Sequence, residues 1–243
     1  MSSSYARNMI QIANRLYWLS EYRPPSDLNE AYFFCIDQEL VYQPFNTDFG
    51  PLSLGQVYKY CIDLQNLLRD SNFKNLDVVH YCNTDPAKRA NAAFLMGAFQ
   101  VVVLKKSAQE AARPFKDIRP ALNPFRDACQ GPCSYKLTIE DCLKGLEFAI
   151  KLGWFSLDKF DLNSFERLEK VENGDVHWII PGKFLAFSTP SDRTSRLSGI
   201  RSHTPDQYAL TFKKLNVKAV VRLNKPLYNA NSFRKHGIEH KDL

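Results

Sequence analysis

Apolar residues recur along this chain with two different periods, and each period predicts a different kind of element. Runs rich in β-branched and aromatic residues predict strands at 31–37, 39–45 and 76–79. Longer stretches with a helical period predict helices at 5–20, 52–69, 107–115 and 138–152. Strands that alternate with helices indicate an α/β domain with a central mixed sheet flanked by helices.

Several of these helices carry recognisable start or stop signals. Ser53 is a plausible N-cap for the helix at 52–69, and Pro24 stops the first helix. Thr138 and Asp141 have the spacing of a capping box. Thr204, followed by a proline, predicts the start of a helix in the last third of the chain.

The stretch 76–104 holds the most suggestive arrangement of residue types. It predicts a strand at 76–79, a polar loop carrying Cys82, a helix, and a second strand from the apolar run at 101–104. A loop that opens on a helix N-terminus is a natural anion site, because free backbone N–H groups and the helix dipole both face it. The same field would stabilise a thiolate at Cys82.

This layout resembles the phosphate-binding loop of the cysteine phosphatases, which reads His-Cys, two residues, Gly, two residues, Arg. Counted from Cys82, Asp85 stands at the glycine position and Lys88 at the arginine position, with Arg89 one place late. A carboxylate in the cradle repels a phosphate dianion, and lysine cannot form the planar fork of arginine. We therefore expect a degenerate phosphate loop without catalytic residues. The alternative is that Cys82 is a small buried hydrophobe, Asp85 a helix N-terminal carboxylate, and the two bases exposed.

Charge and cysteine content narrow the classes of function. The net charge is +6, and residues 181–243 hold 12 basic and 4 acidic residues. The basic residues are scattered without interleaved aromatics, which favours a solvated surface over a nucleic-acid site. No apolar run could span a bilayer, and no signal peptide is evident. We therefore expect an intracellular protein in the nucleus or cytoplasm, associated with the centrosome or cytoskeleton and without membrane contact.

The six cysteines are expected to be reduced thiols rather than disulfides. Cys129, Cys133 and Cys142 lack the paired spacing of a zinc site, and His236 and His240 have no accompanying carboxylate motif. We therefore expect neither a metal nor another cofactor.

The pattern divides the chain into three parts. Residues 1–152 form the first domain, and 153–177 form an acidic connector without a continuous apolar stripe. From 178 a new series begins, with strands near its start, at 217–224 and in 236–243, and helices at 204–216 and 228–236. About 60 residues bury too little surface to close a core alone, so we expect 178–243 to be the start of an incomplete second domain.

Several segments together resemble the cell-division-cycle-fourteen type of dual-specificity protein phosphatases. They are KRANAAFLMGA, FRDA, the ENGD turn, WIIPGKFLAF and RLNKPLY, and the similarity covers nearly the whole chain. The resemblance implies a non-catalytic phosphatase-like domain over 1–152, a linker over 153–177, and the truncated start of a catalytic domain of the same type over 178–243. The HCxxGxxR motif of that family does not occur in these 243 residues.

The resemblance also implies a substrate class. The family prefers phosphoserine followed by proline with a basic residue further on, and an acidic groove binds that base. Matched by position, Glu166, Glu169 and Asp141 fall in this groove. Clustered carboxylates would attract such a basic residue, although Glu166 and Glu169 could equally form a solvated face of a helix.

Three hypotheses about function follow. In the first, the chain is a substrate-recognition part that docks phosphorylated proteins with a basic residue after phosphoserine-proline, and is inactive alone. In the second, it is a fragment of an active protein phosphatase whose catalytic half lies past residue 243. In the third, it is a scaffold or dimerisation domain, whose candidate partner is a second copy of the same chain.

Overall fold

The computed structural model describes residues 8–23, 31–129, 131–191, 196–197, 200–201 and 203–243, with backbone only at 196–197 and 200–201. The chain divides into two compact units, Met1–Phe160 and Asp161–Leu243. Each unit is described by itself below.

The first unit is built on a four-stranded mixed sheet in the order β1-β2-β4-β3. Its strands are β1 (Ile10–Ala13), β2 (Leu16–Ser20), β3 (Ala31–Phe34) and β4 (Asp77–Cys82). β1 and β2 form an antiparallel hairpin, whereas β2 and β3 each run parallel to the central strand β4. The prediction of an α/β domain with a central mixed sheet is therefore confirmed. The prediction of a helix at 5–20 is wrong over 8–20, and residues 5–7 lie outside the described residues.

The error at the N-terminus has a local cause. Leu16 and Trp18 face one side of β2 and Leu19 faces the other. Leu16 and Leu19 are also three residues apart, a spacing that a helix would place on one face. Arg15 has a φ of 57°, which turns the chain between β1 and β2. Its guanidinium group then donates to the carbonyl oxygens of Phe73 and Leu76 at 2.7 and 2.9 Å. Contacts some 60 residues away thus stabilise a hairpin where local spacing favoured a helix.

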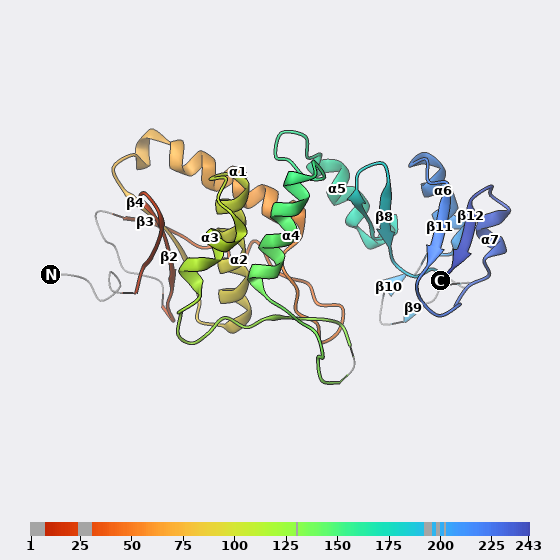
Figure 1. Ribbon diagram of the computed structural model, residues 1–243, viewed down its shortest axis with the longest axis horizontal. Coiled ribbons are helices and arrows are strands. Elements are labelled where there is room, and N and C mark those ends of the chain that lie inside the picture. Colours follow the sequence, from red (N-terminus) through yellow and green to blue (C-terminus); the bar gives the residue numbers. More distant parts are fainter. Residues whose placement is uncertain (1–7, 24–30, 130, 192–195, 198–199, 202) are drawn as a thin grey trace. The chain divides into compact units, whose positions relative to one another are not determined.

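Helices cover the sheet face on which Leu16, Val78 and Cys82 lie (Figure 1). They are α1 (Leu54–Arg69), α2 (Pro86–Val102), α3 (Ala108–Ala112) and α4 (Ile139–Lys151), with short 3-10 turns at Ser71–Phe73 and Arg113–Phe115. The predicted N-cap at Ser53 is confirmed, as is the capping box of Thr138 and Asp141.

Two predicted strands of this unit are wrong. The apolar run at 101–104 continues α2 to Val102 instead of opening a strand, and 39–45 forms turns and loop. A buried helix and a buried strand both present continuous apolar residues, so a short run cannot tell them apart. A two-stranded hairpin, β5 (Phe125–Arg126) with β6 (Lys136–Leu137), completes the elements of the unit.

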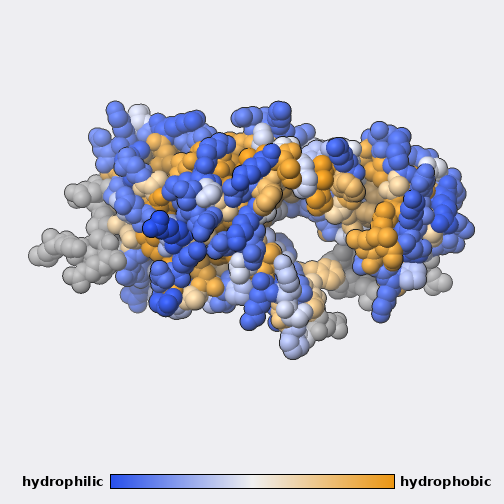
Figure 2. All heavy atoms as spheres, viewed as in Figure 1, coloured by the Kyte–Doolittle hydropathy of each residue, from blue (hydrophilic) through white to orange (hydrophobic). Residues whose placement is uncertain are grey.

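α2 is the central helix of this unit, buried along nearly its whole length. It packs so closely on α4 that a Cβ atom at Gly97 would lie 2.7 Å from Cδ1 of Leu143. On the face of this unit that Figure 2 shows, hydrophilic side chains predominate, with smaller hydrophobic areas between them. The helix is buried from Arg89 onward, whereas Asp85 and Pro86 at its N-terminus are exposed.

The second unit contains α5 (Leu162–Glu169), a 3-10 turn at Val171–Asn173, and the hairpin β7 (Val176–Ile180) with β8 (Phe184–Phe187). A two-stranded ladder of β9 (Arg196–Leu197) and β10 (Ile200–Arg201) precedes α6 (Pro205–Lys214). β11 (Ala219–Arg222), α7 (Asn231–Arg234) and β12 (Glu239–Asp242) follow, and β11 pairs with β12 in parallel.

A cluster of aromatic side chains forms the core of the second unit. Tyr208, Phe212 and Phe233 are its largest fully buried members. The Tyr208 hydroxyl donates to the carbonyl oxygen of Gly174 at 2.7 Å, and a Cβ atom at Gly174 would lie 2.9 Å from the tyrosine ring. The predicted cap at Thr204 is confirmed. The domain limits at 152 and 177 stay predictions; residues 153–160 include Phe155, which is buried in the first core.

Across the described ranges, every helix is too short or too polar to cross a bilayer.

Candidate functional site

Cys82 is the last residue of β4 and lies within the sheet rather than in a loop (Figure 1). Its side chain is fully buried on the helix-covered face. Burial raises the pKa of the Cys82 thiol to about 12 and lowers the pKa of His80, two residues earlier, to about 3. At neutral pH the thiol is therefore protonated and the imidazole is neutral, so this pair offers neither a nucleophile nor a cation to stabilise one.

The backbone amides after Cys82 are already occupied by the protein's own acceptors. Asp85 is the N-cap of α2, and its carboxylate accepts hydrogen bonds from the amides of Ala87 and Lys88, each at 3.0 Å. The amide of Asn83 donates to the carboxylate of Asp37 at 2.8 Å. Two carboxylates thus take the positions that phosphoryl oxygens would occupy in a phosphate cradle.

The two basic residues of the loop do not form a fork for phosphate. Arg89 is only 5% exposed, and its guanidinium group donates to the carbonyl oxygen of Pro120 at 2.8 Å. The alternative of two exposed bases is therefore wrong for Arg89, which is a buried structural residue. Lys88 is half-buried beside the first turn of α2.

The pocket next to this turn is acidic. It has a volume of about 270 Å³, and Asp37, Asp48 and Asp85 line it together with Lys88. The Tyr42 hydroxyl, also in its wall, donates to Asp48, and burial with this hydrogen bond raises the pKa of Tyr42 to about 12. Three carboxylates against one lysine make the pocket unfavourable for an anion.

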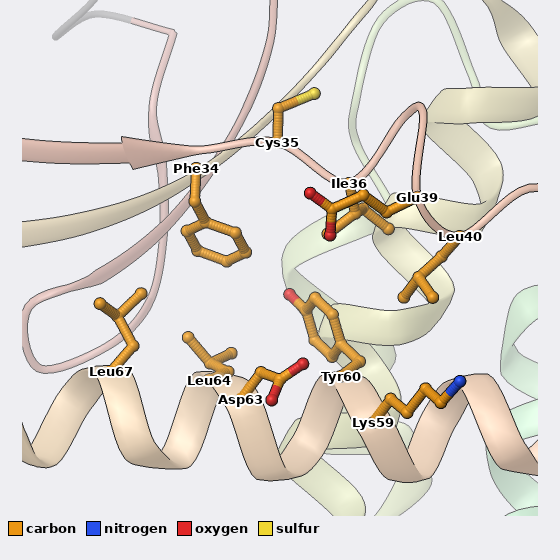
Figure 3. A pocket seen from close by; sticks show the side chains of 10 residues that line it. All are labelled: Phe34, Cys35, Ile36, Glu39, Leu40, Lys59, Tyr60, Asp63, Leu64 and Leu67. Carbon is orange, nitrogen blue, oxygen red and sulfur yellow. The ribbon is translucent and has the colours of Figure 1, made fainter.

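A second pocket of about 370 Å³ lies between α1 and residues 34–40. In Figure 3 the Phe34 ring and the Leu64 and Leu67 side chains point into the space, whereas the Cys35 sulfur points away from α1. Glu39 and Asp63 supply two carboxylates to the wall and Lys59 one ammonium group, and this excess of negative charge is unfavourable for a phosphate.

The acidic groove residues of the linker lie in the second unit. Glu166 and Glu169 are three residues apart on α5, which places both half-buried side chains on neighbouring positions of the helix surface. The field of Glu169 reaches His177, whose ring is 2.9 Å from the Asp175 carboxylate. The hydrogen bond to Asp175 raises the pKa of His177, so the imidazole reports a negative environment beside α5.

Asp141 lies in the first unit, at the start of α4. Its carboxylate accepts hydrogen bonds from the backbone amide and the hydroxyl of Thr138, at 3.0 and 2.5 Å, which lowers its pKa. The structure therefore gives Asp141 a helix-capping contact, and its assignment to the groove stays a prediction.

Sequence reasoning missed two carboxylates that the structure connects to these sites. Asp37 closes the loop after β4 from 46 residues away, and no local pattern signals that contact. Asp175 joins the acidic surroundings of α5 through His177 and also accepts a hydrogen bond from Ser188. Its place in the ENGD turn directly after α5 was a signal that could have suggested it.

Comparison with known proteins gives a consistent result. Residues 10–149 match the family described as "Dual specificity protein phosphatase, N-terminal half". The human "Dual specificity protein phosphatase CDC14A" is 46% identical over 231 residues, which are 95% of this chain and 39% of that protein. "Tyrosine-protein phosphatase CDC14" of Saccharomyces cerevisiae is 32% identical over 247 residues, 99% of this chain and 45% of the relative.

The similarity extends to the nematode "Tyrosine-protein phosphatase cdc-14" of Caenorhabditis elegans, which is 34% identical over 244 residues, 96% of this chain and 34% of the relative. The chain thus spans less than half the length of each of these three relatives. With the mixed sheet, the helix-covered face and the resemblance of its segments, these matches show that the chain belongs to the CDC14 family of dual-specificity protein phosphatases and carries the N-terminal domain of that family.

Proposed function

We propose that this chain is the substrate-recognition part of a CDC14-type phosphatase and that it does not itself hydrolyse phosphate esters. The observation that carries the second half is the closed loop after β4, where the carboxylates of Asp85 and Asp37 bind the amides that would otherwise hold a phosphoryl group. The buried, protonated thiol of Cys82 supports the same conclusion.

The first half of the proposal rests on the acidic surroundings of α5. Glu166 and Glu169 lie on this helix and Asp175 follows it, and the carboxylates of Asp175 and Glu169 raise the pKa of His177. Such a surface attracts a lysine or arginine of an extended peptide. The favoured ligand is a phosphoprotein segment with a basic residue after phosphoserine-proline. We also propose that Asp141 takes part in substrate binding and that the non-catalytic domain ends at residue 152.

Binding of labelled phosphoserine-proline peptides, measured by fluorescence anisotropy, tests this recognition. A peptide with a lysine three residues after the phosphoserine should bind more tightly than one with glutamate there, and added salt should reduce the difference. The double variant Glu166→Lys/Glu169→Lys should weaken binding of the lysine peptide at least about tenfold, because a repulsive charge replaces an attractive one.

The matched control is Asp117→Lys/Glu239→Lys, which changes the net charge equally at two exposed positions outside residues 153–177. If both double variants bind equally well, the α5 surface is not the recognition site. A scaffold role without peptide recognition would then be the better interpretation, and light scattering of the purified chain would test whether it forms a homodimer.

Hydrolysis by the chain is tested separately with an aryl phosphate and with the same phosphopeptides. We expect no turnover above the buffer blank. Turnover that disappears in Cys82→Ser would mean that the buried cysteine acts as a nucleophile, and would overturn the non-catalytic half of the proposal.

We also infer that the protein acts inside the cell, in the nucleus or cytoplasm. All six cysteines are free thiols in the structure, which suits a reducing compartment. A fluorescent fusion would show the location, and secretion of that fusion would contradict the inference.

A further inference from the structure

The loop between β5 and β6 gathers three side chains that can ligate a metal ion. Asp127, Cys129 and Cys133 each offer one ligand atom, and these atoms all lie within 4.8 Å of one another. The two cysteines are half-buried and the aspartate is exposed, so the group is accessible from solvent. The spacing of the cysteines alone did not predict a metal site. The structure adds a third ligand, Asp127, from the start of the loop.

The base of this loop is firmly held in the first unit. Phe125 is 2% exposed and packs against Phe49, with ring centroids 5.2 Å apart. The backbones of Phe49 and Arg126 exchange two hydrogen bonds, at 2.7 and 3.0 Å, and Arg126 pairs with Lys136 of β6. The Arg126 guanidinium group also donates to the carbonyl oxygen of Gly131 at 2.6 Å, across the loop. The loop that carries the three ligand residues is therefore fixed at its base by packing and hydrogen bonds.

The chemistry of the donors selects the kind of ion. Two thiolates and one carboxylate suit zinc, since soft sulfur ligands disfavour magnesium and calcium. Ligand atoms around a tetrahedral zinc ion lie roughly 3.5–4 Å apart, so small side-chain rotations would bring these three into place. We propose that Asp127, Cys129 and Cys133 form a zinc site whose fourth position is taken by water.

In the metal-free arrangement each thiol donates to a backbone carbonyl oxygen of the loop, Cys129 to Pro132 at 3.8 Å and Cys133 to Tyr135 at 2.8 Å. Zinc binding replaces the two thiol protons: Zn²⁺ forms bonds to both sulfurs and to the carboxylate, and two protons leave to solvent without any change of oxidation state. Binding should also hold the two short strands of the hairpin together, because the metal links Asp127 next to β5 with Cys133 shortly before β6.

The test uses the full 243-residue chain, reduced and freed of metal with a chelator. Titration with zinc chloride in competition with a chromophoric chelator should show one ion per chain. Cobalt(II) in place of zinc should give an absorption band from thiolate-to-metal charge transfer. Cys129→Ser, Cys133→Ser and Asp127→Asn should each weaken zinc binding on the order of 10- to 100-fold.

Two further cysteine variants serve as matched controls. Cys35→Ser and Cys142→Ala remove thiols outside the group and should leave zinc affinity unchanged. Circular dichroism and the melting temperature of the metal-free variants show that they fold, since the loop residues contribute little buried surface. A readout independent of metal content is proteolysis, to which zinc should make the 127–135 loop more resistant in the original chain and not in the three ligand variants.

Asp127→Asn separates a metal site from a simple pair of oxidisable thiols. A disulfide between Cys129 and Cys133 needs no carboxylate, whereas zinc affinity should fall when the carboxylate becomes an amide. A reduced chain that binds no zinc at micromolar concentration, or that binds it equally well in all three ligand variants, overturns the proposal. So does zinc affinity that falls in the two cysteine variants and stays intact in Asp127→Asn.

Discussion

The loop after β4 and the surface of α5 both depend on carboxylates, but the carboxylates have opposite effects. In the loop, Asp85 and Asp37 accept hydrogen bonds from the protein's own amides. Beside α5, Glu169 and Asp175 instead surround an imidazole and raise its pKa. In the first place the carboxylates bind backbone amides, and in the second they favour a positive charge on a side chain.

The same contrast bears on the packing beneath the loop. β4 and α2 pack through apolar residues such as Val78 and Ala93, and this packing does not depend on the amides after β4. A single N-capping aspartate accepts hydrogen bonds from two of those amides.

The largest expected effect concerns thiol reactivity. Cys82 is fully buried with a pKa of about 12, so its alkylation by iodoacetamide at pH 8 should be more than about 100-fold slower than that of half-buried Cys133. Mass spectrometry of peptides from timed reactions measures both rates in one sample. Equal rates would mean that the loop opens readily and that Cys82 is accessible.

Replacement of Arg89 should cause the largest loss of stability in this group. Arg89→Ala removes a buried charge-assisted hydrogen bond to Pro120 and should lower the free energy of unfolding by about 2–3 kcal/mol. Lys88→Ala, at the neighbouring half-buried position, should change it by less than about 0.5 kcal/mol. Urea denaturation compares the two, and the reverse order would show that Lys88, not Arg89, is the structural base.

Asp85→Ala should reduce the free energy of unfolding by less than Arg89→Ala does, and it should also allow an oxyanion to bind the N-terminus of α2. Loss of the N-cap should cost about 1 kcal/mol in the free energy of unfolding, whereas Asp85→Asn keeps an acceptor and should cost less. Because the amides of Ala87 and Lys88 become free, the alanine variant should also gain stabilisation by tungstate in a thermal melt. No gain would mean that the cap is not what excludes an oxyanion.

The smallest effect is expected at His177, on the α5 side of the comparison. Its pKa is raised in the folded state, so protonation stabilises the fold below about pH 6.5, and this contribution is lost as the pH rises through the folded pKa. Both side chains of the His177–Asp175 pair are about a third or more exposed, so His177→Gln should cost only about 0.5 kcal/mol at pH 6. The difference should vanish at pH 8.5, and a loss equal at both pH values would contradict an ionic role.

Local patterns predicted the helices whose ends carry caps, at Ser53, Thr138 and Thr204, because those signals lie within a few residues of the turn they satisfy. They failed at 10–20, where Arg15 bonds carbonyl groups more than 50 residues away. For the candidate site, the sequence placed Asp85 and Lys88 at the glycine and arginine positions of the phosphate loop that it resembles. It could not show that Asp37 closes the loop or that Arg89 is buried, since both depend on tertiary contacts.

The most direct measurement is a crystal structure of the chain soaked with tungstate. Closure of the loop by Asp85 and Asp37 predicts that no oxyanion binds the amides of residues 83–88 and that both carboxylates keep their hydrogen bonds. Tungstate bound to the amides of Ala87 and Lys88, with the Asp85 side chain displaced, would contradict it.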